Sequence, residues 1–274
     1  IVGESSVFAK RVNDPETGTG SILWAPNPGM RGGQAIAEII FGLTNPSGRL
    51  PITFPRHAGQ LPVYYNQIRG QHGDRYADLT QDPAFAFGEG LSYTTFAYGE
   101  PTIVGGASNA DGTFAETDTV RAEITLTNTG ERAGVEIVQA YIGDIVTSYS
   151  WTDRELKAFQ RVALEPGETK TVAFEIPVAN CTIVDPDANR IVEPGEFELL
   201  IGHSSRREDL KRTIEDLRSA GFPDETLEEL LKMLEERLKE QTEEHNGGNY
   251  WVGTQGRTPW GNSGWHPNGI RIGG

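Results

Sequence analysis

The sequence predicts an α+β protein of several units: a truncated α/β sandwich unit, an antiparallel β-sandwich, a helical hairpin and an irregular tail. A strand–helix–strand pattern occupies residues 21–54, and period-two hydrophobic alternation recurs between residues 119 and 201. Leucines at helical spacing follow between residues 210 and 238. At 274 residues the chain exceeds one typical domain. We therefore predict units at residues 1–100, 101–207, 208–246 and 247–274.

The first unit is predicted from a strand, a helix and a second strand. Residues 21–25 form a short apolar run, and residues 34–41 carry isoleucines at helical spacing before Gly42, a typical C′ residue. Residues 45–48, Asn-Pro-Ser-Gly, suit a type I turn. Residues 50–54 look like a strand, and their two flanking prolines favour a place at a sheet edge. We expect residues 57–100 to be a long ordered connection.

The second unit is predicted from alternating apolar residues. Val120, Ala122, Ile124 and Leu126 alternate with polar residues before a turn at residues 128–130. Further strands are expected around residues 135–142, 172–176 and 197–201, with Pro-Gly-Glu turns before the last two. Short strands with turns at this spacing predict an antiparallel β-sandwich.

The remaining residues predict helices and then an irregular segment. Ser205 to Glu208 reads as a capping box before a stripe formed by Leu210, Ile214 and Leu217. A second stripe comprises Leu227, Leu230, Leu231, Leu234 and Leu238. Residues 247–274 are rich in glycine and tryptophan and show no period, so we expect them to be irregular unless bound.

Charge and hydropathy exclude several classes of partner. A net charge of −15 argues against nucleic acids and anionic membranes. No apolar run approaches the roughly 18 residues that span a bilayer. Ile1 stands without Met or a basic region, so we expect an interior cut and no signal peptide. Cytoplasm, periplasm and secretion all stay open as locations.

Two runs give the chain its clearest family resemblance. They are Asn-Pro-Ser-Gly-Arg-Leu-Pro at residues 45–51 and Phe-Gly-Glu-Gly-Leu-Ser-Tyr at residues 87–93. With Asn-Thr-Gly at 128–130 and Gly-His-Ser-Ser at 202–205, they resemble the C-terminal region of family 3 glycoside hydrolases of the β-glucosidase and β-xylosidase type. The resemblance implies a fibronectin type III-like sandwich, a remnant of the family's α/β sandwich domain, and a β-glucoside or β-xyloside as substrate of the parent enzyme.

The tail resembles a different family. Residues 247–254 and 267–274 are similar to a segment of bacterial von Willebrand A-type proteins of the CoxE-like group. Their metal-binding pattern, Asp-x-Ser-x-Ser, does not occur in this sequence, so the resemblance implies no metal site here. The chain looks like a junction of two unrelated fragments, natural or artificial.

The carboxylates that glycoside hydrolysis needs are not recognisable. A retaining mechanism uses two carboxyl groups about 5–5.5 Å apart. The resemblance places the nucleophile on an N-terminal barrel, which this sequence does not contain, and the acid/base upstream of residues 22–24. Only Glu4 and Glu16 lie there, and neither sits in a matching motif. We therefore assign no catalytic, cofactor or metal residue, and enzymatic activity stays open.

Other residues have a structural interpretation beside the functional one. Glu89 either lines a pocket or is held by neighbouring N–H groups, and Asp78 either acts in a site or fixes the connection. Cys181, the single cysteine, is a buried small hydrophobe rather than a nucleophile. The histidines show no metal-ligand spacing; they are His57, His72, His203, His245 and His266. Trp251, Trp260 and Trp265 either stack on sugars or anchor a docking surface.

Two functions of different classes follow. The chain is either the C-terminal part of a family 3 glycosidase, inactive alone, or a non-catalytic module that binds carbohydrate or a protein partner. The protein partner would use residues 208–274.

Overall fold

The computed structural model describes residues 20–68, 82–110, 113–215, 250–252 and 270–272. The chain divides into two compact units, Ile1–Gly221 and Phe222–Gly274. The helical elements are α2 (Gly32–Ile40) and three 3-10 turns, η1 (Ala58–Gln60), η2 (Val178–Asn180) and η3 (Arg207–Asp209). The strands of the first unit are β1 (Phe96–Tyr98), β2 (Thr102–Gly105), β3 (Thr119–Asn128), β4 (Gly134–Asp144), β5 (Glu155–Leu164), β6 (Thr169–Pro177), β7 (Ile183–Val184), β8 (Arg190–Ile191), β9 (Phe197–Gly202) and β10 (Leu210–Glu215).

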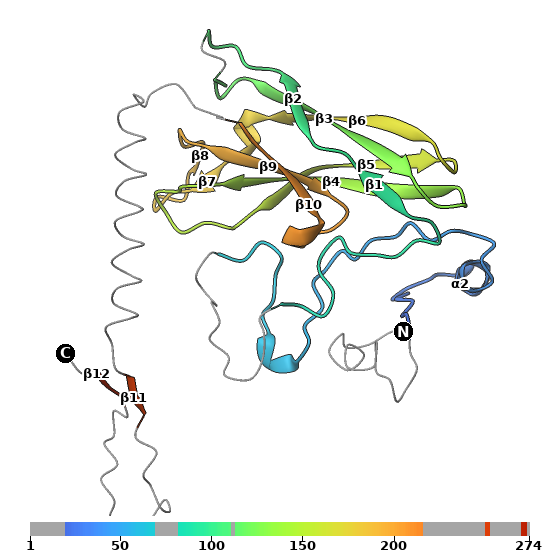
Figure 1. The fold of residues 1–274 in the computed structure, drawn as a ribbon. Coiled ribbons are helices and arrows are strands. Elements are labelled where there is room, and N and C mark those ends of the chain that lie inside the picture. Colours follow the sequence, from blue (N-terminus) through green and yellow to red (C-terminus); the bar gives the residue numbers. More distant parts are fainter. Residues whose placement is uncertain (1–19, 69–81, 111–112, 216–249, 253–269, 273–274) are drawn as a thin grey trace, which may run out of the picture. The chain divides into compact units, whose positions relative to one another are not determined.

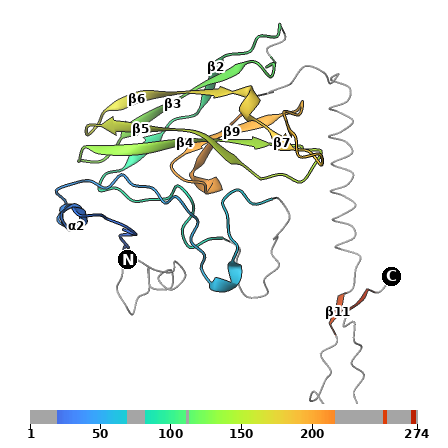
Figure 2. The ribbon, with the colours of Figure 1, turned by 180° about the vertical axis from the view of Figure 1, so that it is seen from behind.

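Two four-stranded antiparallel sheets make up the sandwich (Figure 1). In one sheet β3 pairs with β6 along one edge and with β1 and β2 along the other. The order in the second sheet is β10-β9-β4-β5. Figure 2 shows the same two layers from behind. The predicted sandwich is confirmed.

The core lies between the sheets and follows the predicted alternation. Val120, Ala122, Ile124 and Leu126 on β3 are each at most 1% exposed. Side chains of β4, β6 and β9 meet them, among them Val138, Ala140, Phe174, Ile176, Leu199 and Ile201. On β4 the residues of the core between the sheets are Val138, Ala140 and Ile142, whereas the predicted Val135 and Ile137 are half-buried.

The segment before the sandwich departs from prediction. Helix α2 is confirmed, and Gly42 follows it with a positive φ of 70°. The predicted strands at 21–25 and 50–54 and the turn at 45–48 are wrong: only an isolated bridge joins Phe54 to Phe85. A strand needs a hydrogen-bonded neighbour, and Pro51 and Pro55 cannot donate to one.

The predicted helix beginning at residue 208 is also wrong over its described part. Residues 207–209 form η3, and β10 pairs in register with β9 from Leu210↔Gly202 to Glu215↔Phe197. The exposed edge of β9 offers a ladder of backbone partners, which outweighs the local helix signal. The sandwich therefore extends past residue 207, and it begins with β1, before residue 101.

In the second unit the structure describes one antiparallel pair, β11 (Tyr250–Val252) with β12 (Ile270–Ile272). These six residues were predicted to be irregular, but both segments combine β-branched or aromatic residues, which favour strands. The rest of the predicted hairpin and tail lies outside the described residues. No helix in the described part of the chain is long and apolar enough to cross a bilayer.

Candidate functional site at the junction of the family runs and the sandwich

The two runs that carry the family resemblance lie against each other. The backbone N–H of Leu50 donates to the carbonyl oxygen of Glu89 at 2.9 Å, and the N–H of Gly88 donates to the carbonyl oxygen of Leu50 at 2.7 Å. The Phe54–Phe85 bridge continues the contact. Segments about forty residues apart therefore form one structural unit against the β4–β9 sheet (Figure 1).

A buried ion pair joins the first run to the sandwich. Arg49 Nη2 donates to Glu136 Oε2 at 2.7 Å, and the two side chains are 8% and 2% exposed. The hydroxyl of Tyr98 on β1 donates to Glu136 Oε1 at 3.1 Å. Burial, followed by the charge and hydrogen bond of Glu136, raises the pKa of Tyr98, which keeps its phenol protonated as a donor. Glu136 therefore receives both donors inside the fold.

A side chain of β4, Gln139, binds the second run. Gln139 Nε2 donates to the carbonyl oxygens of Gly88 at 3.1 Å and His203 at 2.6 Å. The Tyr141 hydroxyl fixes the amide by donating to Gln139 Oε1 at 2.6 Å. Gly88 has a φ of 79°, and a Cβ there would lie 2.1 Å from Gln139 Oε1. Both the backbone conformation and this close approach require glycine.

Glu89 is held in place rather than presented to a pocket. Its Oε2 accepts from the backbone N–H of Ala86 at 2.8 Å and from Arg206 Nε at 3.0 Å. Arg206 Nη2 also donates to the carbonyl oxygen of Ala84 at 3.1 Å. The structural interpretation of Glu89 is confirmed, because the carboxylate ties its own loop to the end of the sandwich.

Aromatic rings complete the junction. Tyr65 stacks on Phe87 with ring centroids 4.2 Å apart and meets Tyr141 edge-on at 5.9 Å. The Tyr65 hydroxyl accepts from the backbone N–H of Leu156 at 3.3 Å. This stack buries apolar surface of the connection on the sheet.

Two asparagines satisfy backbone groups where the chain enters the sandwich. Asn45 Nδ2 donates to the carbonyl oxygen of Ala133 at 3.0 Å, and its Oδ1 accepts from the N–H of Tyr93 at 2.8 Å. Asn128 is fully buried; its Nδ2 donates to the carbonyl oxygen of Leu164 at 3.1 Å, and its Oδ1 accepts from Thr94 Oγ1 at 2.6 Å. Asn45 thus makes the long-range contacts that replace the predicted local turn.

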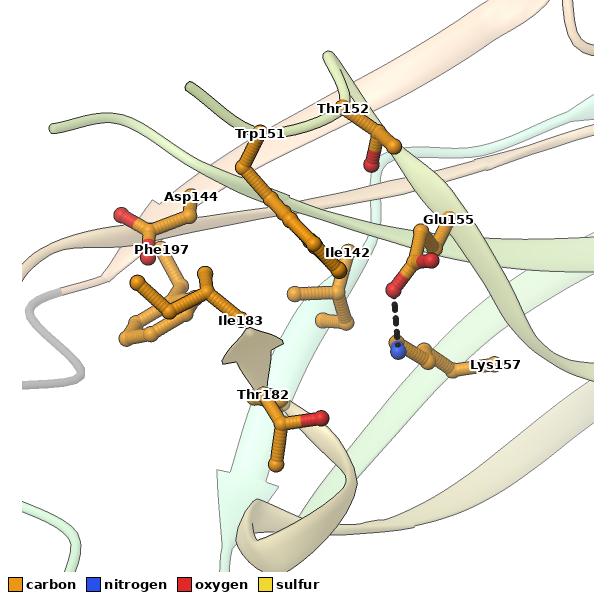
Figure 3. A pocket seen from close by; sticks show the side chains of 10 residues that line it. Ile142, Asp144, Trp151, Thr152, Glu155, Lys157, Thr182, Ile183 and Phe197 are labelled. Atoms are coloured by element: carbon orange, nitrogen blue, oxygen red, sulfur yellow. Dashed lines mark hydrogen bonds and ion pairs between the residues drawn. The ribbon is translucent and has the colours of Figure 1, made fainter. Parts of the chain in front are cut away.

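A small cavity lies at one end of the sandwich (Figure 3). Asp144, Trp151, Glu155 and Lys157 line it, and its volume is about 10 Å³. Lys157 Nζ donates to Glu155 Oε2 at 2.7 Å. The space is that of about one water molecule, whereas sites for organic ligands measure roughly 300–1,000 Å³. The cavity is too small for a sugar ring.

Cys181 also lines this cavity and is 4% exposed. Burial raises the pKa of its thiol to about 11. A thiol that stays protonated at neutral pH is not a nucleophile, so the prediction of a small buried hydrophobe is confirmed.

The remaining sequence candidates do not converge. His57 Nδ1 accepts from the N–H of Gly59 at 3.0 Å, and His203 Nε2 lies 3.3 Å from Asp209 Oδ2. Within the described residues no group of three metal-ligating side chains exists. Trp251 lies in β11. The candidates outside the described residues are Glu4, Glu16, His72, Asp78, His245, Trp260, Trp265 and His266.

Sequence reasoning missed Glu136, Gln139 and Arg206, and did not single out Arg49 within its run. A signal existed for the first two, because polar residues in an otherwise apolar central strand indicate buried hydrogen-bond partners. The carboxylates of this junction, Glu89 and Glu136, each bind an arginine. The junction therefore positions loops, and its geometry is that of a structural clamp.

Known proteins share this architecture. The profile of the glycosyl hydrolase family 3 C-terminal domain matches residues 5–93, and that of the fibronectin type III-like domain matches residues 136–205. A β-xylosidase of Formosa agariphila is 43% identical over 70% of this chain and 26% of its own length. A periplasmic β-glucosidase of Salmonella typhimurium is 39% identical over 65% of this chain and 24% of its own length.

A solved structure of a further β-glucosidase is also similar to this chain. A β-glucosidase from intestinal bacteria, involved in saponin metabolism, is 95% identical, with a TM-score of 0.73 over 80% of this chain and 28% of its own. The chain thus spans about a quarter of the length of the relatives it matches. It carries a glycosyl hydrolase family 3 C-terminal domain joined to a fibronectin type III-like domain.

Proposed function

We propose that this chain is the C-terminal portion of a family 3 glycoside hydrolase that removes terminal β-linked glucosyl or xylosyl residues, and that the portion alone is inactive. The junction is the observation that carries the proposal. Both family runs are occupied in packing against the sandwich, and Glu89 and Glu136 there are bound to Arg206 and Arg49. Carboxylates held in this way are unsuited to attack a sugar or to donate a proton to it.

The substrate class comes from the relatives. Their names are β-xylosidase and β-glucosidase, and the 95% identical protein is a β-glucosidase. We therefore infer a β-glucoside as the first substrate to test and a β-xyloside as the second. Retaining hydrolysis needs two carboxyl groups and no cofactor, so no cofactor is part of the proposal.

Within such an enzyme the role of this portion is to clamp loops. The ion pair of Arg49, the amide of Gln139 and the guanidinium of Arg206 each bond a different point of the two runs. A rigid β-sandwich that fixes loops in this way supports a site whose chemistry comes from elsewhere in the protein.

The test is an assay of the full chain on aryl β-glucosides and aryl β-xylosides. We expect no turnover above the uncatalysed rate. The 95% identical β-glucosidase in its full length serves as the positive control. Turnover by the chain alone that a single Asp or Glu substitution abolishes would contradict the proposed inactivity.

A protein partner for the C-terminal residues stays a prediction. Of the described residues in that segment, 210–215 pair with β9, and 250–252 pair with 270–272. Hydrogen exchange of residues 246–274 with a candidate protein or glucan tests this role, and unchanged exchange with all of them would contradict it. The resemblance of the tail to von Willebrand A-type proteins is likewise a prediction.

A further inference from the structure

Strand β10 is held at the edge of its sheet by polar contacts rather than by burial. Its described side chains, residues 210–213, are half-buried or exposed. The neighbouring β9 is buried at all six of its residues. Lys211 Nζ bonds Glu100 Oε1 at 2.9 Å, at the surface. The edge of β9 is thus an apolar strand whose outer neighbour contributes little to the core.

The sequence of β10 favours a helix over a strand. Ser205 to Glu208 has the pattern of a capping box, and Leu210, Ile214 and Leu217 follow at helical spacing. Of the six residues of β10, only Thr213 and Ile214 are β-branched. A segment whose local preference conflicts with its fold is weakly specified, because the edge and not the sequence imposes the strand.

A buried carboxylate, Glu198, lies on β9 beside the outer strand and pairs with arginines. Glu198 on β9 is 3% exposed in its side chain, with Arg212 Nε at 2.9 Å and Arg207 Nη2 at 3.0 Å. Both arginines come from the segment that forms η3 and β10. When β10 detaches, Arg212 leaves with it and Glu198 keeps only Arg207 of the turn, which destabilises a carboxylate this deeply buried. The edge therefore favours an outer strand that brings arginine.

The reversal before β10 is built independently of the strand. Arg206 N donates to Ser204 Oγ at 3.0 Å, and Asp209 N donates to the carbonyl oxygen of Arg206 at 3.1 Å. A Cβ on Gly202 would lie 2.0 Å from the carbonyl oxygen of Asp209, so this tight approach needs glycine. The strand can thus detach after residue 209 while the turn keeps its own hydrogen bonds.

We propose that the outer edge of β9 is a strand-accepting site for an extended, arginine-bearing segment, and that β10 is its exchangeable resident. The incoming strand pairs with residues 197–202 in the register of β10, with an arginine opposite Leu200 to reach Glu198. Backbone hydrogen bonds supply the affinity and the ion pair supplies the selectivity, as in other cases of strand addition. This inference does not depend on the glycosidase function.

The test uses the full chain and a fluorescent peptide with the sequence of residues 207–215. In Thr213→Pro/Ile214→Pro, one of two adjacent residues must lose a ladder donor, because consecutive N–H groups of an edge strand point to opposite sides. The resident strand should then leave the edge. We expect this variant to bind the peptide at least about tenfold more tightly than the wild-type chain, in which the resident competes.

The matched control is Thr213→Val/Ile214→Val, which keeps both donors and should bind like the wild type. Adding Glu198→Gln to the proline variant should weaken peptide binding by about fivefold or more. A folded proline variant, judged by its near-UV circular dichroism, that binds no better than wild type overturns the proposal.

A second measurement covers a proline variant that does not fold. In the wild-type chain, the amides of residues 210–215 should exchange with solvent at least about tenfold faster than those of β3, because β10 detaches without global unfolding. Equal protection of the two strands overturns the proposal as well.

Discussion

The β-sandwich and the segment before it bury their apolar residues to different extents. On β3 of the sandwich, every second residue is almost completely buried, and Leu126 is 0% exposed. In the earlier segment, Phe41 and Leu43 at the end of α2 are 78% and 79% exposed. The sandwich therefore owes its structure to its own core. The earlier segment is fixed largely by contacts with the sandwich: the polar contacts of Asn45 and Arg49, and the ring of Tyr65 against Tyr141.

The comparison shows what a strand signal needs to become a strand. Residues 120–126 and 50–54 both read as strands in sequence, but only the first run has neighbours on both sides, β6 and β2. The second run makes a bridge at Phe54 and hydrogen bonds at Leu50. Apolar content predicts a strand only where a ladder is available to pair with it.

The largest expected effect comes from breaking the contact between the two regions. Arg49→Met should lower the free energy of unfolding by about 3–5 kcal/mol, because Glu136 stays buried with one hydrogen bond, from Tyr98. Urea denaturation followed by tryptophan fluorescence measures the change.

The double variant Arg49→Met/Glu136→Met separates charge burial from packing. Replacing both partners by apolar side chains should restore most of the loss, because no buried charge remains. A double variant as unstable as the single one would show that Arg49 acts through its packing, and the polar character assigned to this junction would be wrong.

The next effect tests the core of the sandwich alone. Leu126→Ala should lower the free energy of unfolding by about 2–5 kcal/mol, because Leu126 is fully buried between the sheets and its loss leaves a cavity. The same denaturation experiment measures it. If hydrogen exchange shows that residues 84–95 keep their native protection in this variant, the two regions unfold separately.

Sequence reasoning predicted the sandwich well because its signal is local. The period-two pattern of residues 120–126 and 172–176, with glycine turns between strands, is set by which residues face the core. Helix α2 with its glycine end was equally local. The start of β10 failed for the reverse reason: its helix signal was real, but the edge of β9 outweighed it.

The junction was beyond prediction because its contacts are distant in sequence. Arg49 and Glu136 are 87 residues apart, and Arg206 and Glu89 are 117 apart. The two family runs showed which segments resemble a known family, but not which residues of the sandwich they contact. Of the junction residues, only Glu89 was interpreted correctly, as a loop carboxylate held by neighbouring backbone N–H groups.

A smaller effect is expected from the buried thiol of Cys181, which should make the stability of the sandwich depend on pH. Burial raises the pKa of Cys181 from 9.0 to about 11, so the unfolded chain loses its thiol proton at a lower pH than the folded chain. This contribution to stability is complete below pH 9 and is lost between pH 9 and about 11. The loss is about 2–3 kcal/mol by linkage.

Cys181→Ala lacks this thiol and isolates the effect. Between about pH 8 and pH 11, the free energy of unfolding should fall about 2–3 kcal/mol further in the wild type than in Cys181→Ala. Parallel curves for the two proteins would mean that the thiol is not desolvated in solution and that the end of the sandwich opens to water.

The smallest effect is expected from truncating Phe41, an exposed side chain in the segment before the sandwich. Phe41→Ser should change the free energy of unfolding by no more than about 0.5 kcal/mol, because a side chain 78% exposed loses little contact on truncation. Urea denaturation beside Leu126→Ala supplies the contrast. A loss above about 1 kcal/mol would mean that the Phe41 side chain is buried in solution. The apolar contacts of the segment before the sandwich, which join Phe54 to Trp24 and Phe85, would then extend to the end of α2.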